Sequence, residues 1–173
     1  MRRLRWAAAA CVLSLPVAAA GPSEYEVKAA FLFNFSKFVE WPEKAFAGPG
    51  SPIAICVLGE NPFGTLLEDA VRGKQVNGRD LEVRDVTSAA GCHVVFVGAA
   101  ESARDAEVFA RLADQPVLTV SDAETAAARG AIIGLTLEEN RVRFEVNLVA
   151  ARKAGVKLSS QLLKVAVRLI GRL

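Results

Sequence analysis

Histidine is almost absent from this chain: the 173 residues include one, His93. Catalytic serine and cysteine residues usually need a histidine base, and zinc sites usually need histidine or several cysteines. His93 opens a short apolar run, where we expect a hydrogen-bonded structural side chain rather than a catalytic one. The G-x-S-x-G sequence that presents a nucleophilic serine is also missing. We therefore predict a protein that is not an enzyme and binds no metal or other cofactor.

A phosphate-binding lysine is missing as well. Gly59 and Gly64 have the glycine spacing of a phosphate loop, between a predicted strand and a predicted helix. Thr65 stands where that loop needs a lysine, so we interpret the two glycines as turn residues. A weak site for an anion or a small ligand at the start of the following helix is the alternative.

Long apolar segments are confined to the N-terminus. Arg2, Arg3 and Arg5 precede an apolar run over residues 6–20, which ends in small residues. This order is typical of a cleaved secretory signal peptide, and the run is shorter than the roughly 20 residues needed to cross a bilayer. We predict a signal peptide over residues 1–20 and one domain over residues 21–173, located in a bacterial periplasm.

The predicted domain has no large excess of basic or of acidic residues. The chain has 21 basic and 19 acidic residues. Three arginines belong to the predicted signal peptide, which leaves 18 basic against 19 acidic residues and a net charge of −1. A nearly neutral chain has no electrostatic reason to bind nucleic acid, so we expect no such partner.

Two cysteines, Cys56 and Cys92, remain beyond the predicted signal peptide. An even pair in an oxidising compartment favours a disulfide, which would stabilise the fold by roughly 3–4 kcal/mol. Two buried free thiols are the alternative. Cys92 opens its predicted strand whereas Cys56 lies in the middle of another, so strand register leaves the pairing open.

Predicted strands and helices alternate along most of the chain. We expect strands over 53–58, 81–86, 92–97, 117–120, 131–137 and 141–146, and helices over 24–41, 63–72, 102–113, 122–129, 148–153 and 159–169. This alternation predicts an α/β fold: a single-domain three-layer α/β/α sandwich with a mostly parallel, Rossmann- or flavodoxin-like sheet. A hairpin and helices complete its C-terminal part. In a flavodoxin-like order the first and third strands are neighbours.

The first predicted helix is apolar on several sides, and the last carries one apolar stripe. Phe31, Phe35 and Phe38 follow helical spacing, and Phe33 widens the apolar surface sideways. This helix is therefore expected either to lie within the domain or to form a contact in a homodimer or with a partner. In the last predicted helix the stripe consists of Leu158, Leu162, Val165 and Leu169.

The strand over 141–146 has the alternation of a half-buried edge strand. Val142, Phe144 and Val146 point one way. The outward row, Arg141, Arg143, Glu145 and Asn147, is our predicted partner-binding site, with Arg152 and Gln161 nearby. Ordinary solvation of an edge strand is the alternative reading of these polar residues.

Three blocks of the sequence together resemble a known family. They are YEVKAAFLFNFSKFVEWP over 25–42, ICVLG and PFG over 55–64 with CHVVF over 92–96, and VRFEVN through AAR to KLSSQLL over 142–163. With these blocks the chain resembles the YfiR family of small secreted bacterial proteins over nearly all of the predicted domain. By this resemblance, Cys56 and Cys92 match a cysteine pair that the family bridges. A second cysteine pair found in some members is missing here.

The resemblance implies a periplasmic repressor. Such a protein binds the periplasmic region of an inner-membrane diguanylate cyclase and holds it inactive, which lowers cyclic di-GMP and biofilm formation. An OmpA-like outer-membrane lipoprotein would sequester the repressor and release the cyclase. The alternative function is a periplasmic sensor domain that binds a small ligand near residues 59–64 and acts on a different membrane sensor.

Overall fold

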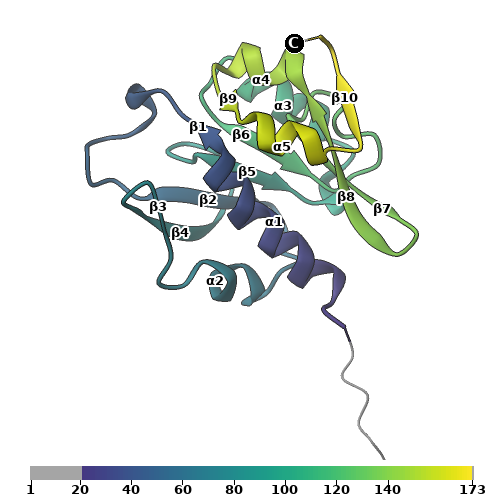
Figure 1. The fold of residues 1–173 in the computed structure, drawn as a ribbon, viewed down its shortest axis with the longest axis horizontal. Helices are drawn as coiled ribbons and strands as arrows, with labels where there is room; N and C mark the ends of the chain where they lie inside the picture. The colour runs from purple at the N-terminus through teal and green to yellow at the C-terminus, as the bar shows by residue number, and fades with distance from the viewer. Residues whose placement is uncertain (1–20, 173) are drawn as a thin grey trace, which may run out of the picture.

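The computed structural model describes residues 21–172. The predicted signal peptide over residues 1–20 lies outside these residues and stays a prediction. The strands of the main sheet are β2 (Ile53–Leu58), β3 (Gln75–Val76), β4 (Arg79–Val86), β5 (Val94–Val97), β6 (Leu118–Ser121), β7 (Ile133–Glu138), β8 (Arg141–Asn147) and β10 (Arg168–Ile170). In space they run in the order β10-β8-β7-β6-β5-β2-β4-β3 (Figure 1).

The predicted fold class is confirmed. The neighbouring strands β4, β2, β5, β6 and β7 run parallel. Counted along the chain they have the spatial order 2-1-3-4-5, which is the flavodoxin-like order. β8 returns antiparallel to β7 as the predicted hairpin. Glu139 and Asn140 both have positive φ at its tip, as a two-residue turn of type I′ requires.

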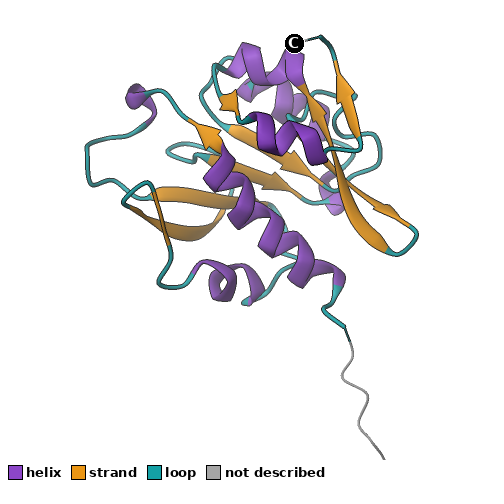
Figure 2. Cartoon of the chain, viewed as in Figure 1, coloured by secondary structure: helices purple, strands orange, loops and turns teal. Residues whose placement is uncertain are grey.

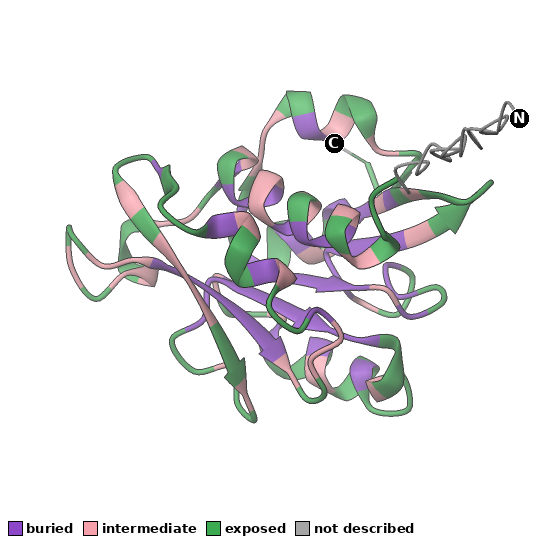
Figure 3. Ribbon diagram, turned by 90° about the horizontal axis from the view of Figure 1, so that it is seen from below, coloured by how far each residue is buried: buried purple, intermediate pink, exposed green. Residues whose placement is uncertain are grey.

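Helices cover both faces of the sheet, which makes three layers (Figure 2). α1 (Glu24–Phe38), α2 (Leu66–Val71), α4 (Leu148–Ala154) and α5 (Ser160–Val165) share one apolar core with the sheet, and α3 (Asp105–Leu112) shares the other. Successive residues of β5 alternate between the two cores, with Val94 and Phe96 on the α1 side and Val95 and Val97 on the α3 side. Buried residues accordingly line the central strands (Figure 3).

The first helix lies on one face of the sheet, with α2 and α5 beside it in the same layer (Figure 1). Ser23 caps its N-terminus, and Phe35, which is fully buried, stacks on Phe31 and meets Phe144 of β8 edge to face. α1 also packs on α2 and α5. This arrangement explains why the helix is apolar on more than one side without requiring a dimer. The helix stops earlier than predicted because β1 (Val39–Glu40) pairs with β9 (Lys157–Leu158).

Two predicted helices are wrong in whole or in part. Residues 122–129 form turns rather than a helix, and Thr125 has a φ of 56°, which α-helix excludes. The last helix ends at Val165, and Arg168–Ile170 instead form β10 on β8. The predicted apolar stripe consequently fails, because Leu162 is buried while Val165 is 65% and Leu169 is 39% exposed.

Short 3-10 helices, η1 (Glu43–Ala45) and η2 (Ala99–Glu101), complete the described elements. Among residues 21–172, no helix combines the length and the apolar character that crossing a membrane requires. The same residues contain no cluster of histidine, cysteine and acidic side chains with the arrangement of a metal site.

Candidate functional site: hairpin groove, disulfide and strand-end crevice

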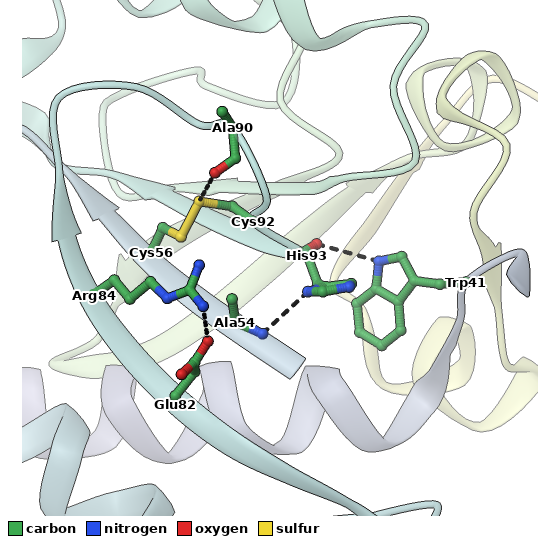
Figure 4. Close-up of a disulfide and its surroundings, with 8 residues drawn as sticks. All are labelled: Trp41, Ala54, Cys56, Glu82, Arg84, Ala90, Cys92 and His93. Carbon is green, nitrogen blue, oxygen red and sulfur yellow. Dashed lines mark hydrogen bonds and ion pairs between the residues drawn. A yellow bond between two sulfur atoms is a disulfide. The ribbon is translucent and has the colours of Figure 1, made fainter. Parts of the chain in front are cut away.

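Cys56 and Cys92 form a disulfide (Figure 4). Their Cα atoms are 5.9 Å apart, within the usual range for such a bond. β2 and β5 are neighbours, as the predicted strand order requires. Cys92 precedes β5 in a turn and is therefore not held to the register of the strand, which lets its sulfur reach diagonally to Cys56. The disulfide expectation is confirmed.

Both ring nitrogens of His93 lie within hydrogen-bonding distance of backbone groups. Its Nδ1 accepts a hydrogen bond from the amide of Ala54 at 3.1 Å, and its Nε2 lies 3.1 Å from the carbonyl oxygen of Ala45. These partners assign the neutral ring with the proton on Nε2. Phe46 stacks on the ring, with 4.4 Å between ring centroids.

Burial lowers the pKa of His93, and the positive charges of Arg79 and Arg84 lower it further, against the opposing hydrogen bond to Ala45. Both ring nitrogens are engaged by backbone groups, as we expect of a hydrogen-bonded structural side chain.

The predicted partner row on β8 is only partly a surface. Arg141 and Arg143 are exposed, near the turn of the hairpin. Glu145 pairs with Arg168 of β10 at 2.7 Å. Asn147 is 8% exposed: its Oδ1 accepts from the amide of Ala150, which caps α4, and its Nδ2 donates to the carbonyl of Ala127.

The expectation that Asn147 belongs to an outward row is therefore wrong. Strand alternation gives the direction of its side chain correctly, but the turn at residue 127 covers that side of the strand. The description of β8 as an edge strand is also wrong for its second half, because β10 pairs with residues 145–147.

Arg152 and Gln161 do not lie beside the two arginines of the hairpin. Arg152 belongs to α4, which begins where β8 ends, and donates to the carbonyl of Arg172. Seven strand residues separate the hairpin turn from that end of β8, a distance of roughly 20 Å. Gln161 is exposed on α5, which packs against α1. The predicted site is thus divided among separate places.

A groove of about 470 Å³ lies between the start of α1 and the hairpin, and it includes the two exposed arginines. Val27 and Phe31 of α1 and Leu137 of β7, which is 52% exposed, supply apolar walls. We call this site the hairpin groove. Its lining residues are Pro22, Glu24, Val27, Phe31, Leu137, Asn140, Arg141, Val142 and Arg143.

The α1 and β7 walls of the hairpin groove are the part that sequence reasoning missed. Helical spacing identifies Phe31 as an apolar position, but its proximity to β8, and that of Val27, depends on how α1 crosses the sheet. Leu137 offered a weak signal, since it is a large apolar residue next to the acidic turn of the hairpin.

A larger crevice, of about 650 Å³, opens at the carboxyl ends of β2, β4 and β5 on the α3 side. Gly59, with φ +85°, ends β2 there, and a Cβ at this position would lie 2.7 Å from Oε1 of Glu101. Arg104, which immediately precedes α3, and Arg111 of α3 line the crevice, and each lies within ion-pair distance of a glutamate three or four residues before it. Gly64 lies outside it. The crevice is lined by Leu58, Gly59, Thr87, Ser88, Ala89, Ala90, Val97, Glu101, Arg104, Glu107, Val108, Arg111, Leu112 and Gln115.

A solved structure has a similar fold. It is the crystal structure of a conserved domain protein from Vibrio cholerae O1 biovar eltor, with a TM-score of 0.54 and 15% sequence identity. The similarity covers 85% of this chain and 60% of that one, so this chain spans about 60% of the length of its structural relative. At this identity the likeness is one of fold alone.

The family assignment comes from the sequence. The family model described as YfiR/HmsC-like matches residues 25–167, a range that contains all but the first residue of α1, the disulfide, the hairpin and both C-terminal helices. Proteins of this family are periplasmic and regulatory, and the family is connected with cyclic di-GMP signalling. The resemblance noted from the three sequence blocks is thereby confirmed, and the chain belongs to the YfiR/HmsC-like family.

Proposed function

We propose that this protein is a periplasmic repressor that binds the periplasmic region of an inner-membrane diguanylate cyclase and holds the enzyme inactive. Family membership supports the regulatory role in cyclic di-GMP signalling. We choose the hairpin groove as the binding site because it combines apolar walls with two exposed arginines.

The chemistry of the hairpin groove suits a partner segment that offers an apolar side chain and a carboxylate. Phe31 and Leu137 supply apolar contact area, and the guanidinium groups of Arg141 and Arg143 supply donors for carboxylates in a fixed fork geometry. Arginine and buried aromatic residues are the types that most often dominate the energy of protein interfaces. In the described residues, neither of these arginines has an acidic partner within ion-pair distance, so both guanidinium groups are available.

Repression needs differential binding. A bound protein shifts an enzyme toward its inactive state only by the difference between its affinities for the two states. Converting a mostly active cyclase into a mostly inactive one requires about 5 kcal/mol of that difference. One well-packed apolar anchor and two charge-assisted contacts are of the right order to supply it.

The test is repression in cells that carry the cyclase and this protein. The double substitution Arg141→Ala and Arg143→Ala should raise cyclic di-GMP to the level of cells without the repressor. Arg72→Ala is the control, since Arg72, just after α2, is an exposed arginine near the opposite edge of the sheet. Retained repression by the folded double variant would remove the hairpin groove from the proposal, and Gln161→Ala and Arg152→Ala would then be the next variants.

Release would come from competition. An OmpA-like outer-membrane lipoprotein that binds the repressor away from the inner membrane would free the cyclase and raise cyclic di-GMP. Crosslinking of the tagged protein in its own cells should then capture two classes of protein, a cyclase and a lipoprotein. Capture of a different membrane sensor would preserve the regulatory role and change the pathway.

The second candidate function is a sensor that binds a small ligand, and the strand-end crevice favours it. In open parallel sheets, ligands bind outside the carboxyl ends of the strands where the strand order reverses. Here that point lies between β2 and β5, and Leu58 and Val97 at their ends both line the crevice. Thermal stabilisation by a member of a panel of small metabolites, lost on Arg104→Ala with Arg111→Ala, would support this function. Uniform lack of stabilisation across the panel would count against it.

A further inference from the structure

Charge is strongly segregated along this chain. Residues 146–173 contain six basic and no acidic residues, whereas residues 21–145 contain 12 basic and 19 acidic ones. The C-terminal segment therefore carries +6 from its side chains, and the remainder of the predicted domain carries −7. A net charge near zero hides this asymmetry.

Exposed aliphatic residues occur in the same segment. Among the described residues, five large apolar side chains are exposed, and four of them are Val149 (53%), Val165 (65%), Val167 (44%) and Leu169 (39%). Scattered single residues of this kind are ordinary on protein surfaces, but clustering of exposed apolar side chains marks an interaction surface.

The elements that carry these residues lie at one corner of the domain, where α5 leads into β10 and α4 packs beside β10 (Figure 1). Val149 of α4 lies against Gly171: a Cβ added at Gly171 would be only 2.7 Å from Cγ2 of Val149. Arg152 donates to the carbonyl of Arg172. We call this region the C-terminal corner, and it comprises Val149, Arg152, Lys164, Val165, Val167, Leu169 and Arg172.

Helix dipoles explain part of the positive charge. Arg152 and Lys153 lie in the last turn of α4, and Lys164 in the last turn of α5, where cations are favoured. Two of the six basic residues also have acidic partners, Lys153 with Asp114 and Arg168 with Glu145. The dipoles do not explain the absence of acidic residues, nor why aliphatic side chains remain exposed between the cations.

We propose that the C-terminal corner docks on an anionic phospholipid surface. Basic side chains attract the headgroups, while valine and leucine side chains enter the boundary between headgroups and acyl chains. The composition favours lipid over a protein partner, because valine and leucine are under-represented among the residues that dominate protein interfaces, and six basic residues without an acidic one suit a uniformly anionic surface. Such binding is weak and reversible, because it rests on a few basic and aliphatic side chains at the interface. It is independent of the proposed repression and would concentrate the protein at the membrane.

The test is sedimentation of the purified protein with vesicles of phosphatidylcholine alone or with 30% phosphatidylglycerol. We expect at least fivefold more bound protein on the anionic vesicles at 50 mM salt, and a loss of most of it at 300 mM salt through screening. The double variant Lys164→Glu with Arg172→Glu should reduce binding to the anionic vesicles at least fivefold. The double variant Val165→Ser with Val167→Ser should also reduce this binding, although it leaves the charge of the protein unchanged.

Arg72→Glu with Lys74→Glu is the control of equal charge change away from the C-terminal corner. Equal binding to both kinds of vesicle, or equal losses in the corner and control variants, would overturn the proposal. Binding that requires an acidic membrane protein in the vesicles would also overturn it, in favour of a protein partner. The repression assay reads cyclic di-GMP instead, so the two proposals can fail separately.

Discussion

The ammonium group of Lys28 lies 2.5 Å from Oδ2 of Asp122 and joins the first helix to the carboxyl end of β6. The two side chains are 7% and 3% exposed. Asp122 also accepts hydrogen bonds from the Tyr25 hydroxyl at 3.1 Å and the Ala99 amide at 2.8 Å. Glu24 lies 2.5 Å from Lys28. The carboxylate of Asp122 thus connects α1 to two loops at the end of the sheet.

Removing this carboxylate should destabilise the fold. Burial lowers the pKa of Lys28, but hydrogen bonds to Asp122 and Glu24 raise it by more, so the ammonium stays charged well above neutral pH. Asp122→Ala leaves the Lys28 ammonium buried with only the partly exposed Glu24 as its partner, and we expect the free energy of unfolding to fall by about 3 kcal/mol. Lys28→Met with Asp122→Leu should recover most of the loss, because paired apolar groups tolerate burial. Urea unfolding measures the free energy of unfolding of the single and double variants. If the effects of the two substitutions simply added in the double variant, Lys28 and Asp122 would not be coupled.

The disulfide should contribute measurably to stability. It closes a loop with a sequence separation of 36 residues. In the chain-entropy model such a loop stabilises by roughly 4 kcal/mol. Cys56→Ala with Cys92→Ala should therefore lower the midpoint of unfolding, and a reductant should lower it for the wild type alone. A double variant as stable as the oxidised protein would show that the bond stabilises little.

His93 should make stability depend on pH. Its pKa is lowered in the folded state, so below about pH 6.5 the unfolded chain binds a proton that the folded protein excludes. The stability that neutral His93 contributes is fully present above the pKa of histidine in the unfolded chain. It is lost as the pH falls through the lower pKa of His93 in the folded protein. His93→Asn retains an acceptor for the Ala54 amide without titrating. Unfolding measured from pH 5 to pH 7.5 should show a flatter profile for this variant than for the wild type.

Asn147 should affect stability rather than partner binding. Asn147→Ala removes the cap of α4 and leaves the carbonyl of Ala127 without its donor. We expect a loss of about 1–2 kcal/mol in the free energy of unfolding. Asn147→Ser keeps an acceptor for the cap and buries no charge, so it should be the milder change. Arg143→Ala, on the same side of β8, is the control and should leave stability within about 0.5 kcal/mol.

The fold was largely predictable because its strongest signals are local. Continuous apolar runs of four to six residues, as in β2 and β5, indicate strands buried on both faces, and their spacing indicates intervening helices. The residues after Lys164 were ambiguous, because Val165, Val167 and Leu169 fit a strand as well as a helix. The unpaired outer edge of β8 decided between them, since β10 satisfies its hydrogen-bonding groups.

The candidate site was predictable only in part. Alternation in β8 correctly separates Phe144 from the arginines, because side chains on a strand have a fixed period of two. It does not reveal which outward side chains another segment covers. Arg143 remains exposed, whereas Asn147 is buried by a turn about 20 residues earlier in the chain.

The sequence by itself determined the α/β class, the family and the expectation of a disulfide, because periodicity and short motifs are properties of neighbouring residues. The tertiary structure alone decided which polar residues form a surface. Contacts such as Asn147 with Ala127, or Val27 with the hairpin, join segments 20 to more than 100 residues apart. They depend on how the layers pack, which no local pattern encodes.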